Sequence, residues 1–172
     1  MTAAVVWPAA LGIFALSEPV IMKFEGFRSR PYLCPRGKAT IGYGTTRYPN
    51  GWPVGLMDKP CTEQEARGYL KFSMHRVLAE LQRPGNVRRS PTLHQAAALL
   101  ILAYNVGVGA HDGIKGDLAD STLLDLFNRG DISGAAQQFL AWNKTHVDGR
   151  LVALDGLTAR RRSEQKLFLT QE

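Results

Sequence analysis

Residues 24–46, FEGFRSRPYLCPRGKATIGYGTT, contain the change of pattern that decides the fold. Before this stretch, Ser17-Glu18-Pro19 has the features of a helix start, with Ser17 as N-cap and Pro19 in the first turn. The apolar residues that follow, up to Phe27, have helical spacing. From Arg28 to Thr46, apolar and β-branched residues alternate with Gly and Pro, which is typical of short strands and tight turns. The stretch therefore predicts a helix that leads into a small lobe rich in β-hairpins.

Helical patterns dominate the rest of the chain, after an irregular Pro- and Gly-rich loop at residues 48–60. Capping boxes at 62–65 and 92–95 each predict a helix start. The first helix ends at Pro84-Gly85 and is long enough to bridge two lobes, and the second is apolar on nearly every side up to Val106. Shorter helices are expected after Ser121 and Asp131, and a last one from about Thr158 to Leu169. We expect an α+β fold, with a mainly helical lobe, a small β-hairpin-rich lobe and a cleft between them.

Composition limits the class of protein. The chain has 172 residues, of which 45% are hydrophobic and 21% charged, and these values exclude a disordered tail, a collagen-like fibre and a multi-span membrane protein. The net charge of +6 favours an anionic partner such as nucleic acid, acidic lipid or a wall polymer. We find no nucleic-acid-binding motif, so no nucleic-acid partner is expected.

Residues 1–16 form an apolar N-terminal extension to a domain expected at residues 17–172. The apolar run is shorter than a membrane span and is interrupted by Pro8 and Gly12, so no stable span is expected. It also lacks the basic segment of a secretory signal. We expect an arm or helix packed on the domain, and the alternative is a weak export or membrane-arrest signal.

The cysteines and histidines suggest neither a disulfide framework nor a metal site. Cys34 and Cys61 are too few for such a framework, and their spacing matches no zinc or redox motif. The four histidines stand apart, without the spacing of metal ligands. We expect two reduced thiols, no metal and no cofactor.

Glu25 is the candidate catalytic residue because it lies between Phe24 and Phe27. A carboxyl group among apolar side chains loses solvation of its charged form, and the protonated acid can donate a proton to a leaving oxygen. Eight residues separate Glu25 from Cys34, and five separate Cys34 from Thr40, so a hairpin could bring all three to one cleft. Taken alone, a glutamate at a helix end is more often an ordinary surface charge.

The same stretch resembles the active-site segment of the phage-type lysozymes, the muralytic endolysins of tailed phages. Their pattern is Glu, eight residues, Asp or Cys, five residues and Thr, followed by Ile-Gly-Tyr/Ile-Gly. Glu25, Cys34, Thr40 and residues 41–44 match it. Four further segments resemble the family in the same order: AYNVGVGA (103–110), DSTLLDLFNRGD (120–131), AAQQFLAW (135–142) and GLTARRRSEQKLF (156–168). The resemblance covers about residues 17–170 and implies a lysozyme-like fold.

This resemblance also implies a reaction, namely hydrolysis of the β-1,4 bond between N-acetylmuramic acid and N-acetylglucosamine in peptidoglycan, with inversion. By the same comparison, Glu25 is the general acid and Thr40 orients the attacking water. The residues implied to line the saccharide cleft are Tyr43, Tyr104, Asn105 and Ser121.

Cys34 stands where the family more often has Asp. Three roles are open for it: a thiol that positions water, a thiolate that stabilises charge, or a structural residue beside a sufficient Glu25 and Thr40. In an exported enzyme it could also pair with Cys61. At the start of the last helix, Arg161 and Arg162 are expected mainly to pack and to form local pairs, for example Arg161 with Glu164.

Two alternative functions remain from the sequence. A lytic transglycosylase would use Glu25 alone and form a 1,6-anhydro ring, and a non-catalytic basic module would only bind the wall. The resemblance implies a monomer that waits in the host cytoplasm for release by a pore-forming holin and acts in the periplasm on the cell wall. Export by residues 1–17 as a signal-arrest segment is the alternative route.

Overall fold

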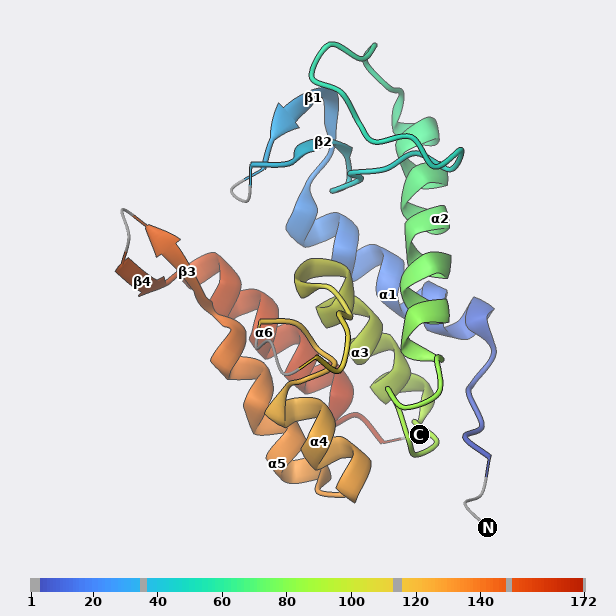
Figure 1. Cartoon of the computed structure of the whole chain (residues 1–172), viewed down its shortest axis with the longest axis vertical. Helices are drawn as coiled ribbons and strands as arrows, with labels where there is room; N and C mark the ends of the chain where they lie inside the picture. The colour runs from blue at the N-terminus through green and yellow to red at the C-terminus, as the bar shows by residue number, and fades with distance from the viewer. Residues whose placement is uncertain (1–3, 35–36, 113–115, 148–149, 172) are drawn as a thin grey trace.

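The fold is α+β, as expected, and consists of a small β-hairpin lobe above a larger helical lobe (Figure 1). The computed structural model describes residues 4–34, 37–112, 116–147 and 150–171. The elements, in chain order, are α1 (Ala10–Glu25), β1 (Arg28–Leu33), β2 (Ala39–Gly42), α2 (Glu63–Leu81), α3 (Leu93–Val106), α4 (Thr122–Arg129), α5 (Ile132–Gln138), the 3-10 helix η1 (Phe139–Trp142), β3 (Lys144–Val147), β4 (Arg150–Ala153) and α6 (Asp155–Phe168).

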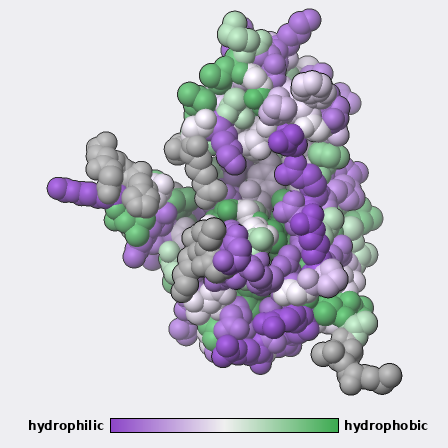
Figure 2. All heavy atoms as spheres, in the orientation of Figure 1, coloured by the Kyte–Doolittle hydropathy of each residue, from purple (hydrophilic) through white to green (hydrophobic). Residues whose placement is uncertain are grey.

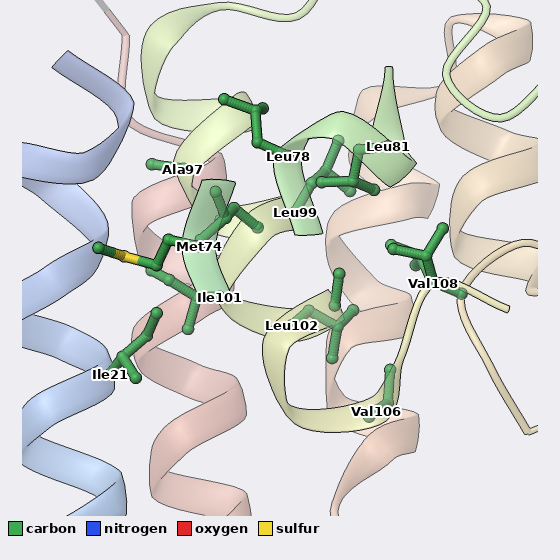
Figure 3. Close-up of a cluster of buried hydrophobic side chains, with 14 of the residues drawn as sticks. Ile21, Met74, Leu78, Leu81, Ala97, Leu99, Ile101, Leu102, Val106 and Val108 are labelled. Atoms are coloured by element: carbon green, nitrogen blue, oxygen red, sulfur yellow. The ribbon is translucent and has the colours of Figure 1, made fainter. Parts of the chain in front are cut away.

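Helix α3 is the centre of the helical lobe, and α1, α2 and α6 all pack against it. Thr92 forms the expected capping box, in which its hydroxyl accepts a hydrogen bond from the Gln95 backbone N–H. Nearly every side chain of α3 is buried, as the apolar pattern predicts. Figure 3 shows Leu99, Ile101 and Leu102 among buried side chains from α1 and α2. Each such side chain contributes about 1.5–3 kcal/mol through its burial, so α3 organises the fold.

The small lobe is built on the expected hairpin. Strands β1 and β2 are antiparallel, with Tyr32 opposite Thr40 and Leu33 opposite Ala39. The backbone N–H of Cys34 donates to the Lys38 carbonyl at 2.9 Å, which closes the described part of the turn. Helix α2 begins with the predicted capping box at Thr62 and runs from this lobe to the helical lobe.

The expected helix start at Ser17 is wrong, because α1 begins at Ala10. Ile13 and Phe14 are buried, and this packing extends the helix by two turns beyond the local start signal. Ser17 is itself buried in mid-helix, where its hydroxyl donates to the Ile13 carbonyl at 2.8 Å instead of capping. The expected boundary between residues 16 and 17 therefore falls inside a continuous helix.

Other boundaries follow local signals more closely. Ser121 and Asp131 cap α4 and α5 as predicted, and Gly130 ends α4 with φ of 89°. The last helix begins at Asp155, three residues before the expected start. The hairpin of β3 and β4 was not predicted, and it projects from the helical lobe (Figure 1). Its strand β4 is exposed throughout, so it lacks the alternating burial that would mark it in the sequence.

Candidate active site

Glu25 is the last residue of α1, and Gly26 turns the chain from there toward β1 with φ of 67°. The Glu25 side chain is 18% exposed, and its Oε1 accepts a hydrogen bond from Nη1 of Arg160 at 2.7 Å. Arg160 belongs to α6 and is only 5% exposed. The sequence placed this carboxyl among apolar side chains, and the structure adds a contact with a buried guanidinium from the far end of the chain.

Arg160 is part of a buried cluster of four charged side chains. Its Nε donates to Oε1 of Glu164 at 3.2 Å, and Nη2 of Arg161 forms an ion pair with the same oxygen. Glu164 and Arg161 are both 0% exposed. Burial raises the pKa of Glu164 to about 7, whereas the two arginines act in the opposite direction. Burial lowers the pKa of Arg161 to about 10, which still leaves it charged at neutral pH.

Asn105 joins this cluster from α3. Its Oδ1 accepts a hydrogen bond from Nη2 of Arg161 at 3.1 Å, so the Asn105 amide is oriented with its oxygen toward α6. The expected local pair of Arg161 with Glu164 is confirmed at 2.9 Å. A chain of contacts thus connects Glu25 to Asn105 through two arginines and Glu164.

Thr40 lies on β2, and Cys34 directly follows β1 at the turn of the same hairpin. Thr40 is 2% exposed, and its Oγ1 donates to the Lys38 carbonyl at 2.9 Å. Tyr32 is the cross-strand partner of Thr40, so their side chains share one face of the hairpin. Partial burial, and then the negative charge of Glu25, raise the pKa of Tyr32, and Cys34 also acts on it. Tyr32 is therefore near enough to Glu25 for its charge to act on the tyrosine hydroxyl.

Tyr104 connects the two lobes. Its hydroxyl donates to the backbone carbonyl of Tyr43 at 2.7 Å. Burial, and then the charge of Glu25, raise the pKa of Tyr104 well above its usual value, so its hydroxyl remains a donor. The Tyr43 side chain points away to α2, where its hydroxyl donates to Glu63 at 2.8 Å. Tyr43 lines a cavity of about 620 Å³ beside α1, and in the described part of the chain Glu25 is not among the lining residues.

Ser121 lies on the helical lobe. Its Oγ accepts from the Leu124 backbone N–H and donates to the Leu118 carbonyl, which together begin α4. It lines a polar cavity of about 320 Å³ with residues that include Arg88 and His111. The structure thus connects Glu25 to Asn105 through the charged cluster and places Tyr104 near enough for the charge of Glu25 to act on its hydroxyl. The side chains of Tyr43 and Ser121 bind elsewhere.

Gly44 allows the Glu25 carboxyl to lie against the small lobe. A Cβ atom at this position would be 3.0 Å from Oε2 of Glu25, and the φ of 86° already disfavours other residues. Because Gly44 has no side chain, the Glu25 carboxylate fits beside it. Gly44 directly follows Tyr43, whose backbone carbonyl accepts the hydrogen bond from Tyr104.

Sequence reasoning missed two residues of this arrangement, Arg160 and Tyr32. Three consecutive arginines at 160–162 gave no sign of which one contacts Glu25. The position of Tyr32 opposite Thr40 follows from a hairpin register that the sequence alone does not specify.

Cys34 and Cys61 are both present as thiols. Within the described ranges, no three His, Cys, Asp or Glu side chains are arranged to hold a metal ion. Among the residues that the structure describes, no helix has the length and apolar character of a membrane span.

Figure 2 shows this face of the molecule hollowed between its upper part, which carries β1 and β2, and the helices below. Charged and polar residues border the hollow, and the hairpin of β3 and β4 projects to the left. The surface thus has a depression between the two lobes, as expected for a cleft between them.

Comparison with known proteins identifies the family. The family described as Phage lysozyme matches residues 22–164. The endolysin of Acyrthosiphon pisum secondary endosymbiont phage 1 is 34% identical over 149 residues, or 87% of this chain and 92% of that protein. A SAR-endolysin of Bacteriophage PS119 is 32% identical over 145 residues, 84% of this chain and 76% of that protein.

A solved structure shows the same fold over nearly the whole chain. The endolysin from Escherichia coli O157:H7 phage FAHEc1 aligns with a TM-score of 0.74 and 30% sequence identity, covering 94% of this chain and 92% of that one. The family match, the similar sequences and the similar structure all indicate the same family. The chain therefore belongs to the phage lysozyme family, a family of peptidoglycan-degrading enzymes.

Proposed function

We propose that this chain is an endolysin that hydrolyses the β-1,4 bond between N-acetylmuramic acid and N-acetylglucosamine, with Glu25 as the general acid. The observation that carries the proposal is the position of Glu25. Its carboxyl is largely buried at the point where α1 meets the small lobe, and a buried arginine holds one of its oxygens. A fixed carboxyl of this kind can present a proton to one defined oxygen of a bound glycan.

Arg160 supports the second half of the proton transfer. When Glu25 gives its proton to the leaving oxygen, it becomes a carboxylate, and the guanidinium 2.7 Å away stabilises that charge. A bound glycan that covers Glu25 excludes water from the carboxyl and from the leaving oxygen that receives its proton. Substrate binding and proton transfer are thus linked at this carboxyl.

Thr40 orients the water that attacks the sugar from the opposite face. Its hydroxyl hydrogen is committed to the Lys38 carbonyl, so its oxygen lone pairs face a water as acceptors. Cys34 lies beside the same hairpin turn, where it positions this water or stabilises charge as a thiolate. Attack by a held water gives inversion at the anomeric carbon.

Tyr104, Asn105, Ser121 and Tyr43 are proposed to contact the saccharide. Asn105 is oriented by Arg161, and Tyr104 ties the helical lobe to the small lobe. Ser121 and Tyr43 would contact sugars farther from the cleaved bond, because neither side chain lies in the set around Glu25.

A lytic transglycosylase is the second candidate, and Cys34 favours it. A thiol with a pKa near 8.5 in water is mainly neutral at pH 7, unlike the aspartate more common at this position. Without a fixed negative charge there, the sugar's own hydroxyl could replace water as the nucleophile. A held water at Thr40 favours hydrolysis instead.

We propose that the enzyme accumulates in the host cytoplasm as a monomer and reaches the wall when a holin opens the inner membrane. Described residues of the apolar N-terminal segment, Ile13 and Phe14 among them, pack into the domain core, which supports a structural role for this segment. Signal-arrest export remains the alternative, because SAR-endolysins are among the relatives.

Mass spectrometry of digested peptidoglycan tests the proposal. Purified sacculi are incubated with the wild-type chain and with Glu25→Gln, and the muropeptides are analysed. We expect reducing N-acetylmuramic acid ends from the wild type and about 100-fold or more loss of product with Glu25→Gln. Products with 1,6-anhydro ends would establish the transglycosylase instead. Binding to sacculi without any product would indicate a wall-binding module.

A further inference from the structure

Glu164 is a fully buried carboxylate that the proposed reaction does not use directly. Its Oε1 accepts a hydrogen bond from Nε of Arg160 at 3.2 Å and forms an ion pair with Nη2 of Arg161 at 2.9 Å. Its Oε2 is buried and has no hydrogen-bond partner in the part of the chain that the structure describes. Burying such a group costs free energy, and an ion pair in the core is weak evidence for stability. The cluster therefore calls for another explanation.

The contacts of Arg160 offer an explanation for the buried charge of Glu164. Its guanidinium is held at two atoms by two carboxylates, through Nη1 by Glu25 and through Nε by Glu164. The planar guanidinium cannot rotate about one contact without losing the other. The Phe24 ring, with its centroid 5.8 Å from the Arg160 Cζ, packs beside it. Glu164 thus determines where the donor for Glu25 lies.

Arg161 links Glu164 in the same way to Asn105, one of the residues proposed to contact the saccharide. One atom, Nη2, contacts both Glu164 and the Asn105 side-chain oxygen. Arg161 is fully buried, so its direction depends on these partners. A single carboxylate thus orients one arginine toward Glu25 and the next one toward Asn105.

We propose that Glu164 is a positioning residue for catalysis: it holds Arg160 against Glu25 and Arg161 against Asn105, and it balances their charge. The inference rests on the proposed function, in which Glu25 is the general acid. It assigns Glu164 no contact with the substrate.

The charge balance predicts the direction of the effect. Glu25 and Glu164 offset Arg160 and Arg161, so the cluster is neutral when all four are ionised. The charged groups that act on Glu164 are Arg161 and Arg160 from its own helix and Glu25 from α1. Helix α3 faces the cluster with the neutral Asn105, and α5 and η1 contact α6 through the Ala136 carbonyl and the Phe139 ring. Removing the charge of Glu164 leaves two cations and one anion in the cluster, and this excess positive charge changes the pH dependence of a reaction that needs a proton there.

The test is the pH–activity profile of Glu164→Gln, which keeps the shape of the side chain and removes its charge. Muropeptide release from purified sacculi is measured between pH 4 and 9 for the wild type, Glu164→Gln, Glu25→Gln and the control Glu80→Gln. We expect the alkaline limb of Glu164→Gln to move toward acid by about one pH unit, with about a tenfold loss of activity at pH 7. Glu80→Gln, on α2, keeps the wild-type profile.

The outcomes separate the two proposals. If the wild type releases no muropeptides, the proposed function fails. If the wild type is active and Glu164→Gln has the same limb and rate, the positioning role is refuted. A uniform loss at every pH without a shift would also refute it, because a merely structural defect lowers the amount of active enzyme and leaves the limb in place.

A second measurement needs no change at Glu164. Carbon-13 NMR of labelled glutamate side chains follows the titration of Glu164 in the wild type and in Glu25→Gln. Because the charge of Glu25 contributes to the raised pKa of Glu164, we expect the midpoint of Glu164 to fall in Glu25→Gln. An unchanged midpoint would refute the coupling even if Glu164→Gln did not fold.

Discussion

Nη1 of Arg160 lies 2.7 Å from Oε1 of Glu25, although the two residues are 135 positions apart in the sequence. Helix α6 thereby contributes directly to a site whose other candidate residues come from α1, α3, the start of α4 and the small lobe. The contact is buried on the arginine side and partly exposed on the carboxyl side.

Replacing Arg160 by Lys tests the importance of the planar guanidinium. A single ammonium cannot reach both Glu25 and Glu164, so one charged hydrogen bond is lost. We expect the free energy of unfolding to fall by about 1.5–3 kcal/mol, and peptidoglycan release to fall as well. Urea unfolding and muropeptide release measure the two effects. Arg129→Lys, in an exposed ion pair with Asp125, is the control and should change neither. Wild-type behaviour of Arg160→Lys would contradict the role.

Gly44→Ala tests the close approach of Glu25 to the small lobe. The added Cβ would lie 3.0 Å from Glu25 Oε2 and push the carboxyl away from its position. The control is Gly51→Ala, which has nearly the same positive φ (89° against 86°) and no neighbour within 4 Å. Both variants should lose similar stability, of roughly 1 kcal/mol, from the backbone strain. Only Gly44→Ala should lose most of its activity, and equal activities would show that the approach is unimportant.

Cys34→Asp and Cys34→Ser distinguish the roles of the thiol. Asp restores a fixed negative charge and should keep or raise activity, whereas Ser should keep some of it. Lysis of permeabilised cells, followed by turbidity, compares the variants at one pH. Cys61→Ala, at the buried thiol near Gly42, controls for the loss of a thiol elsewhere. If Cys34→Ser and Cys34→Asp both behaved like the wild type, Cys34 would have no chemical role.

Thr40→Ala should lower turnover, because the oxygen that orients the water is removed. The loss of one hydrogen bond in the transition state corresponds to about tenfold in rate. Thr40→Ser keeps the hydroxyl and should recover most of the activity. Initial rates of reducing-end release provide the comparison, with thermal unfolding as a check of folding. An equal loss in Ser and Ala would point to the methyl group and to packing instead.

Deletion of the N-terminal segment tests whether it belongs to the domain. A chain that starts at Glu18 lacks Ile13 and Phe14, whose burial contributes about 1.5–3 kcal/mol each. We expect it to unfold at a much lower temperature, whereas a chain that starts at Ala10 keeps α1 whole and stays close to the full-length protein. Circular dichroism melting curves measure both. A shorter chain as stable as the full one would show that the segment is dispensable.

Local signals in the sequence predict much of the fold. Thr62, Thr92, Ser121 and Asp131 each cap the helix that they were expected to begin, because a capping hydrogen bond reaches only three residues along the chain. The hairpin of β1 and β2 follows from alternating residues and turn formers in the same way. The spacing of Glu25, Cys34 and Thr40 also pointed to the segment that carries the candidate site.

By itself, then, the sequence determined the helix caps, the central buried helix α3 and the family to which the chain belongs. Tertiary structure alone decided that α1 begins seven residues before Ser17, because the packing of Ile13 and Phe14 outweighs a local start signal. It alone also decided that Arg160, not its neighbours, contacts Glu25. Arg160 and Arg161 are buried and Arg162 is exposed because of how α6 is rotated against α3, and that rotation results from burial summed over the whole interface.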